Sequence, residues 1–526
     1  MTATLPAVAR PAPRARAPWG LTLVIAVAIA ARLVALPGST ERSMDADGPH
    51  LLNVARCFER GQGFSNPAAW PAWMKPARLP MPETFKEPGY PWLIARLARV
   101  AGGEFRAAIL ISLFAGLLLP VALFALARAL GLDPAEATLA ALIAAASPLG
   151  IFMSVRVTVD SLFPALLTAA FALAAWRPAP RPAWADVATG IAAGLAFMAR
   201  GQALVATPAL AVLLAARRPR AGAWSGIAIA AVAAITTASP FIVRNLRLFG
   251  VPFYSDVGEY GLWPYVDHLT FSHGLARPPA PLGFALTHVP EVLRHMGESL
   301  FRFCVYALPG DILGNAAWLV PLAAGAVLAL LRGWTFLPVA LYLGATIAFI
   351  FAINWDARYW ASTVPFWALI AALGAAWVAR TLGGHVVAGP VRASHVLIAA
   401  TAVTIAVQAE DGRRQVARFL APEMDAAIAE APFLRSHLEP GEAVMAVTTS
   451  FYSWFADRPS VHLVIADRAA FAATVRRLRV RYAALPTSRL AEFAARYPDG
   501  RLPDLLVPDH EDPQRDVTVF RVVDDH

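Results

Sequence analysis

Long apolar runs, separated by short segments that carry arginine, constrain this chain more than any other feature. Hydrophobic residues make up 58% of the sequence and charged residues only 15%, whereas soluble domains carry about 25% charged residues. Such runs cross a bilayer as helices, because lipid offers no water to hydrogen-bond an exposed backbone. The sequence therefore predicts a polytopic α-helical membrane protein and excludes an ordinary soluble enzyme.

Eleven apolar segments, several of them short for a bilayer, are predicted to be transmembrane helices. They are 19–36, 107–127, 137–153, 162–176, 185–198, 203–214, 224–242, 316–331, 336–353, 362–378 and 395–407. The first is interpreted as a span and not as a cleaved signal peptide, because Arg32 interrupts it and no small-residue cleavage site follows.

The arginines set the predicted orientation, because short cytoplasmic loops carry an excess of Lys and Arg. When the N-terminal tail, residues 1–18, lies in the cytoplasm, every predicted cytoplasmic loop carries arginine. An odd number of spans then places the C-terminus outside, together with long loops at 37–106 and 244–315. These arginines also account for the net charge of +9, so that charge implies no nucleic-acid partner.

The composition becomes that of a soluble protein from about residue 408. Strand-like runs alternate there with helical patterns, the strands at 443–448, 461–465, 480–484 and 517–523 and the helices at 416–438, 469–478 and 489–497. This alternation is typical of an α/β fold. We expect a transmembrane domain over 19–407 and a small extracytoplasmic α/β domain over 408–526.

Acidic residues at the predicted outer ends of spans are informative, because charges near lipid are costly and usually face a cavity or a ligand. Asp45 and Asp47 follow the first span and precede a helical stretch at 51–59, and Asp160 opens the fourth span. Such acids could simply cap helices, since a helix N-terminus favours an anion. Alternatively, Asp45 or Asp47 could be a general base.

Four cations are predicted on the same outer face, where positive charge is disfavoured. Lys86 is one of only two lysines in the chain, and beside Glu87 it could hold a phosphate as a point charge. Arg200, Arg244 and Arg358 also fall on this side. Each arginine alone could be an interfacial side chain, but together they indicate a site for an anionic membrane substrate.

Six short motifs run through nearly the whole chain: Asp47 with Ala55 and 61–63, then 87–91, Asp160, 198–200, 239–245 and 356–359. In these motifs the chain resembles the bacterial polyprenol-phosphate-sugar glycosyltransferases of the GT-C superfamily. This group includes the protein mannosyltransferases of glycosyltransferase family 39 and the aminoarabinose transferases. Gly48 follows Asp47 where the family often has a second acid, so the base stays open between Asp45 and Asp47. The spacing to the following helix favours Asp47.

The resemblance implies a multi-pass glycosyltransferase of the bacterial inner membrane. It would transfer a hexosyl or pentosyl group, with inversion, from an undecaprenyl-phosphate carrier to a hydroxyl of a lipid, glycan or protein on the outer face. One carboxylate would deprotonate the acceptor, and cations would stabilise the phosphate leaving group. The substrate-binding residues that it implies are Lys86, Glu87, Asp160, Arg200, Arg244, Asn245, Arg358 and Tyr359.

This scheme needs no nucleotide, and a divalent metal is left open. Some members of the family hold a metal near the acids of the first loop, and His50 with Glu87 could supply two ligands, which do not form a complete coordination set. The alternative function is a secondary transporter or flippase for an anionic lipid or solute. Because transporters often contain inverted repeats and none is evident here, the glycosyltransferase is the preferred interpretation.

Overall fold

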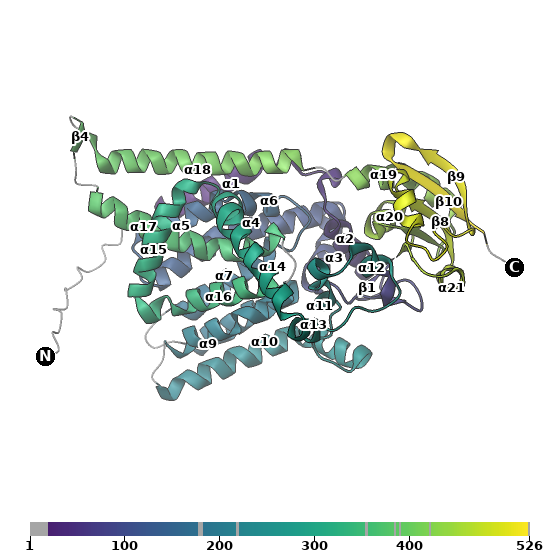
Figure 1. The fold of residues 1–526 in the computed structure, drawn as a ribbon. Coiled ribbons are helices and arrows are strands. Elements are labelled where there is room, and N and C mark those ends of the chain that lie inside the picture. Colours follow the sequence, from purple (N-terminus) through teal and green to yellow (C-terminus); the bar gives the residue numbers. More distant parts are fainter. Residues whose placement is uncertain are drawn as a thin grey trace.

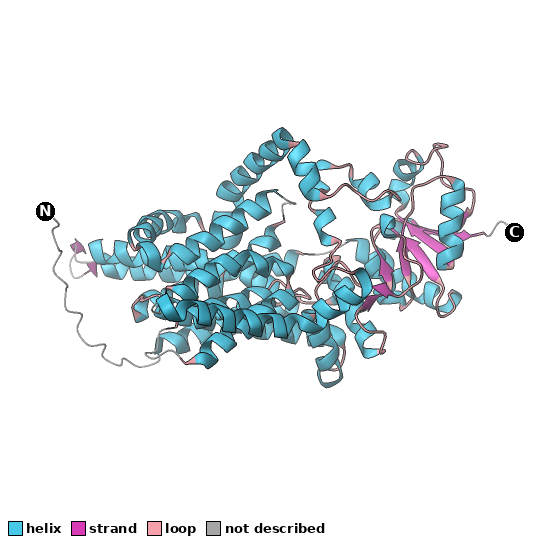
Figure 2. Cartoon of the chain, turned by 90° about the horizontal axis from the view of Figure 1, so that it is seen from below, coloured by secondary structure: helices cyan, strands magenta, loops and turns pink. Residues whose placement is uncertain are grey.

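The computed structural model consists of a bundle of apolar helices with a mixed β-sheet beyond one end of it, as Figure 1 and Figure 2 show. The structure describes residues 19–176, 182–216, 220–352, 356–382, 386–388, 391–419 and 422–523. The predicted N-terminal tail, residues 1–18, lies outside the described residues.

The helices of the bundle are listed here with their bounds: α1 (Trp19–Ala35), α4 (Glu104–Ala129), α5 (Pro134–Ala146), α6 (Pro148–Ser154), α7 (Leu162–Ala175), α8 (Ala183–Ala199), α9 (Thr207–Ala215), α10 (Arg220–Phe249), α15 (Leu319–Leu331), α16 (Leu337–Ala352), α17 (Val364–Leu382) and α18 (Ala393–Arg418). Small residues let neighbouring helices approach closely. At Gly190 of α8, for example, a Cβ atom would lie 2.1 Å from the carbonyl oxygen of Ala230 in α10.

The lengths of these helices suit a membrane protein. Within the described residues, five helices are long and apolar enough to cross a bilayer, or up to seven if each of two bent pairs is one span. One pair is α5 with α6, bent by 59°. Each of the eleven predicted segments contains helix, but four are apolar helices of only 10–17 residues. The count of eleven spans and the orientation stay predictions.

Two long connections supply shorter elements, and Figure 1 shows α2, α3 and α12 between the bundle and the sheet. The first connection contains α2 (Asp47–Glu59), β1 (Ser65–Asn66), β2 (Ala68–Ala69), β3 (Met81–Pro82) and α3 (Gly89–Ala101). The second contains α11 (Val257–Tyr260), α12 (His268–His273), α13 (Pro281–Thr287) and α14 (Val289–Arg302).

The C-terminal part of the chain folds around a six-stranded sheet in the order β2-β7-β6-β8-β10-β9. Its elements are α19 (Pro422–His437), β6 (Ala443–Ala446), α20 (Thr449–Ala456), β7 (Ser460–His462), α21 (Arg468–Leu478), β8 (Val480–Leu485), α22 (Leu490–Ala494), β9 (Leu506–Asp512) and β10 (Val517–Val522). The strand β9 has no counterpart among the predicted strands, because this edge strand is polar and mostly exposed and so lacks a buried apolar run.

The edge strand β2 comes from the first connection, so the sheet is completed by a segment nearly 400 residues away in sequence. Ala68 pairs with Ser460, and Ala69 pairs with Val461, in parallel register. The sequence does not predict this pairing, because a strand of two alanines carries no periodic pattern. It ties the C-terminal domain to the connection that carries Asp47.

A second attachment joins α2 to α20. Asn53 donates a hydrogen bond to the carbonyl of Ser450 at 2.9 Å. Arg56 donates to the carbonyl of Trp454 at 3.1 Å, and its guanidinium lies 3.9 Å from the centre of the Trp454 ring. It also pairs with Asp457 and Glu104, each at 3.2 Å. The C-terminal domain therefore contacts the second half of α2 through Asn53 and Arg56.

Replacing Arg56 with Leu should weaken this attachment. The change removes a cation shared by Asp457 and Glu104 and its contact with the Trp454 ring. We expect a loss of about 1–2 kcal/mol in the free energy of unfolding, measured by thermal denaturation in detergent. Arg468→Ala is the control, because the Arg468–Asp504 pair is exposed. Equal losses in the two variants would show that Arg56 does not hold the domains together.

Candidate active site

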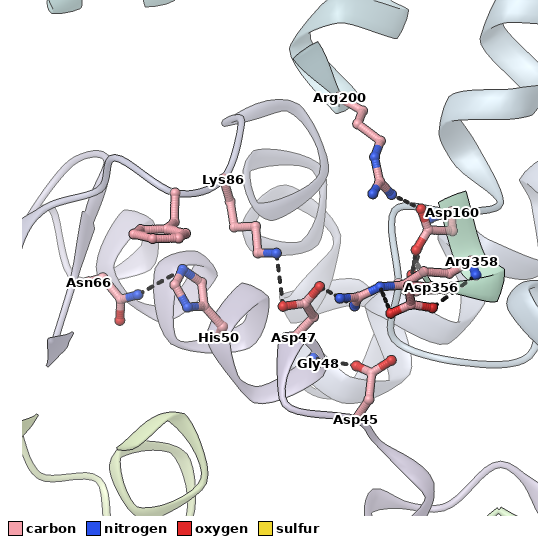
Figure 3. Close-up of polar contacts among 12 residues, drawn as sticks. Asp45, Asp47, Gly48, His50, Asn66, Lys86, Asp160, Arg200, Asp356 and Arg358 are labelled. Carbon is pink, nitrogen blue, oxygen red and sulfur yellow. Dashed lines mark hydrogen bonds and ion pairs between the residues drawn. The ribbon is translucent and has the colours of Figure 1, made fainter. Parts of the chain in front are cut away.

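Asp47 lies at the centre of a group of charged side chains, which Figure 3 shows. It is the first residue of α2, whose start is stabilised by the Gly48 N–H donating to Asp45 Oδ1 at 3.1 Å. The Oδ1 atom of Asp47 lies 2.8 Å from Lys86 Nζ, and its Oδ2 atom accepts a hydrogen bond from Arg358 Nη1. Three segments distant in sequence thus meet at one carboxylate.

Arg358 is held in position by its own neighbours. It lies in the 3₁₀ helix Ala357–Thr363, and Asp356 caps this helix by accepting the Arg358 N–H at 3.0 Å. The other oxygen of Asp356 lies 2.8 Å from Arg358 Nε. The guanidinium therefore lies between the carboxylates of Asp47 and Asp356.

Asp160 and Arg200 form a second ion pair beside the first (Figure 3). Thr158 Oγ1 donates to Asp160 Oδ2 at 2.8 Å. The ring of Tyr359 connects the two pairs, because the guanidinium of Arg200 lies 4.8 Å from its centre and that of Arg358 lies 5.5 Å from it. Glu87 accepts the N–H of Gly201 at 2.6 Å and so holds the turn that carries Arg200.

Asp45, the alternative base, lies next to Arg156, with 3.8 Å between Asp45 Oδ2 and Arg156 Nη2. The guanidinium of Arg156 lies 4.4 Å from the ring centre of Phe152 and 3.7 Å from that of Phe419. The sequence analysis does not select Arg156 as a site residue. A cation at the predicted outer end of a span is the signal that could have found it.

Two of the carboxyl groups have displaced pKa values of opposite sign. Burial alone would raise the pKa of Asp47, but the charges of Arg358 and Lys86 outweigh burial and hold this pKa well below its usual range. Asp47 is therefore ionised at neutral pH. Burial raises the pKa of Glu87, and the Gly201 N–H and Arg200 only partly oppose this effect.

His50 has a partner other than the predicted Glu87. Its Nε2 atom lies 2.8 Å from Glu83 Oε2 and 2.9 Å from Asn66 Nδ2. Burial raises the pKa of Glu83, but His50 and the other hydrogen-bond donors outweigh it and lower the pKa to about 2. Glu83 also accepts the N–H of Lys86 at 2.9 Å. This buried network, which the sequence does not reveal, positions the segment that carries Lys86.

The two residues considered as metal ligands each have another partner in the structure. His50 is engaged with Glu83, and Glu87 is hydrogen-bonded to the backbone of Gly201. Across the part of the chain that the structure describes, no group of three or more His, Cys, Asp or Glu residues is arranged to hold a metal ion.

Arg244 and Asn245 brace the long connections and lie outside the cavity described next. Arg244 Nη2 donates to the carbonyls of Glu83 at 2.7 Å and Phe64 at 3.3 Å. Asn245 is buried and donates to the carbonyl of Tyr254 at 3.2 Å. The structure therefore places these two predicted substrate-binding residues where they hold backbone, and not beside Asp47.

A cavity of about 820 Å³ opens beside Asp47, between the bundle and the C-terminal domain. This volume lies within the range of about 300–1,000 Å³ that is typical of small-molecule sites. Among its lining residues are Asp45, Asp47, Lys86, Arg156, Asp356, Arg358 and Tyr359 on one side, and Ser450, Tyr452, His462, Arg489 and Arg515 of the C-terminal domain on the other. Asp160, Arg200 and Glu87 are not among the lining residues.

Residues 82–243 match the family model described as dolichyl-phosphate-mannose-protein mannosyltransferase. The fold is similar to that of ArnT from Cupriavidus metallidurans in the apo state, with a TM-score of 0.61 and 16% identity over 96% of this chain and 98% of that chain. It is also similar to the Archaeoglobus fulgidus oligosaccharyltransferase tethered with an acceptor peptide, with a TM-score of 0.63 and 13% identity over 97% and 74% of the two chains.

The chain has the GT-C fold. This result confirms the resemblance stated from the motifs. ArnT bound to undecaprenyl phosphate is similar as well, at a TM-score of 0.59 and 15% identity over 97% of this chain and 99% of that chain. None of the curated proteins compared with the chain by sequence matches it. The GT-C likeness does not favour the transporter or flippase alternative.

Arg244→Ala and Arg358→Ala should have different effects. Arg244 supports backbone carbonyls, so its loss should cost about 1–3 kcal/mol of stability and change the apparent Kd for a prenyl phosphate little. Arg358 faces the cavity, so its loss should weaken that binding by about tenfold or more. Thermal denaturation measures the stability of each variant, and titration with the prenyl phosphate measures its apparent Kd. Equal weakening of binding would place Arg244 in the ligand site.

Proposed function

We propose that this protein is a membrane glycosyltransferase, which moves a sugar from a polyprenyl-phosphate carrier to an acceptor hydroxyl. The observation that carries this proposal is the pairing of Asp47 with both Lys86 and Arg358 at the wall of a cavity in a GT-C fold. Among the similar structures, ArnT is bound to undecaprenyl phosphate and the archaeal oligosaccharyltransferase AglB to a dolichol-phosphate. These ligands support a lipid-linked phosphate as the donor.

The side chains at the cavity suit an inverting displacement. Asp47 is the general base that takes the proton of the acceptor hydroxyl, and the acceptor oxygen attacks the anomeric carbon of the sugar. Lys86 and Arg358 bind the phosphate, whose negative charge grows as the bond to the sugar breaks. Arg200 and Asp160 are not among the lining residues and act through Tyr359. No covalent intermediate is needed.

The two sides of the cavity suggest how the substrates are arranged. The cations of the bundle side take the donor, whose prenyl chain lies in the membrane. The side formed by the C-terminal domain, with Ser450, Tyr452 and His462, takes the acceptor, which is a lipid, a glycan or a protein. The proposed location is the bacterial inner membrane, with the N-terminus in the cytoplasm and the catalytic cavity on the outer face.

Asp47→Asn should reduce sugar transfer by about 10²–10⁴-fold, because the amide cannot accept the acceptor proton. The assay measures transfer from a polyprenyl-phosphate sugar in membranes that contain the variant, and the thermal midpoint of the purified protein shows that it is folded. Asp45→Asn is the matched control and should keep most of the activity. If Asp45→Asn were inactive while Asp47→Asn retained turnover, Asp45 would be the base.

A further inference from the structure

The free enzyme holds Asp47 in a form unsuited to its proposed task. Both carboxylate oxygens contact cations, Oδ1 the Lys86 ammonium and Oδ2 the Arg358 guanidinium. A cation beside a carboxylate favours its ionised form and so lowers its affinity for a proton. A carboxylate paired with two cations is therefore a weak base, although the reaction requires Asp47 to accept a proton.

Lys86 and Arg358 are placed so that an arriving anion could bind them. Both line the cavity, and their side chains are 21% and 17% exposed. Lys86 carries its charge on a flexible stem with three rotatable donors. Its backbone stays anchored, because Glu83 accepts its N–H at 2.9 Å. Arg358 is likewise anchored by its ion pair and backbone hydrogen bond with Asp356. These contacts do not involve Asp47, so they persist when Arg358 moves away from Asp47.

The other ionisable groups around Asp47 are engaged with partners of their own. Three ionisable groups near it pair with other residues, His50 with Glu83, Asp45 with Arg156, and Arg200 with Asp160, whereas Asp356 shares Arg358 with Asp47. Within the described residues, Asp47 forms ion pairs with Lys86 and Arg358. Arg358 and Lys86 are the cations that lower the pKa of Asp47 most, so a change in these two contacts changes its basicity.

Resting on the proposed function, we propose that Lys86 and Arg358 are exchangeable cations, which the donor phosphate draws away from Asp47. Binding of the donor thereby converts an ion-paired carboxylate into the working base. The donor must then bind before the acceptor can be deprotonated, so the reaction follows a compulsory order. An acceptor that enters the empty site meets a carboxylate with little affinity for its proton.

The charges balance through the transfer. The acceptor oxygen forms a bond to the anomeric carbon, and the bond between that carbon and the phosphate oxygen breaks, with its electron pair left on the phosphate. The acceptor proton moves to Asp47, which becomes neutral. The phosphate changes from a singly charged diester to a doubly charged monoester. The total charge of the site is unchanged, and both cations remain with the anion whose charge grows.

The pH dependence of the wild-type enzyme tests this exchange. The value of kcat/KM for the donor reports the free enzyme, whereas kcat/KM for the acceptor at saturating donor reports the donor complex. Removal of the cations raises the pKa of Asp47, so activity in the donor complex should be lost at a higher pH as the solution is acidified. We expect the acid limb of the pH profile of kcat/KM for the acceptor to lie about one pH unit or more above that of kcat/KM for the donor. Coincident limbs would overturn the exchange.

A second measurement needs no turnover, because the chain has only two lysines, Lys75 and Lys86. Reductive methylation with ¹³C-formaldehyde gives each lysine and the N-terminal amine an NMR signal, and the signal missing from the Lys86→Arg variant is that of Lys86. A short-chain prenyl phosphate should move the Lys86 signal and leave that of Lys75, which does not line the cavity, in place. An unchanged Lys86 signal at saturating prenyl phosphate, with binding shown by a raised thermal midpoint, would contradict the exchange.

The two proposals can fail separately. If no polyprenyl-phosphate sugar supports transfer by the wild-type protein, the proposed function is wrong. If transfer occurs and needs Asp47, but the two acid limbs coincide and the Lys86 signal does not respond, the glycosyltransferase stands and only the exchange of cations is wrong.

Discussion

The pairing of Asp47 with Lys86 and Arg358 is the interaction on which the site depends. Partial removal from water makes an isolated carboxylate costly, so cations must compensate for its burial. Each cation comes from a segment with its own support, since Glu83 holds the backbone of Lys86 and Asp356 holds Arg358. The neighbours of Asp47 thus hold the backbone of Lys86 and the side chain of Arg358 in place. Both cations also line the cavity, where they can bind a ligand.

The C-terminal domain contributes to this site in two ways. It provides one side of the cavity, and it holds α2 through hydrogen bonds from Asn53 and Arg56 to backbone carbonyls of α20. The pairing of β2 with β7 attaches the same connection to the edge of the sheet. Removing the domain would therefore expose the cavity and also remove one of the supports of the helix that begins with Asp47.

The sequence was sufficient to predict the helices and the class of the charged site, and insufficient for the paths of the connections. Apolar runs locate helices because burial in lipid demands them. The acids and cations at the predicted outer ends of spans could be selected because charge near lipid is costly, and the structure brings Asp47, Lys86 and Arg358 together. Arg244 carries the same signal, yet it binds carbonyls of the first connection, because no periodic pattern shows where a loop returns.

The position of a bound prenyl phosphate tests the central claim most directly. We expect a cryo-electron microscopy map of the complex to show the phosphate within hydrogen-bonding distance of Lys86 Nζ and the Arg358 guanidinium, with Asp47 no longer contacting both. A phosphate bound at another surface of the bundle, with both ion pairs of Asp47 intact, would contradict the account.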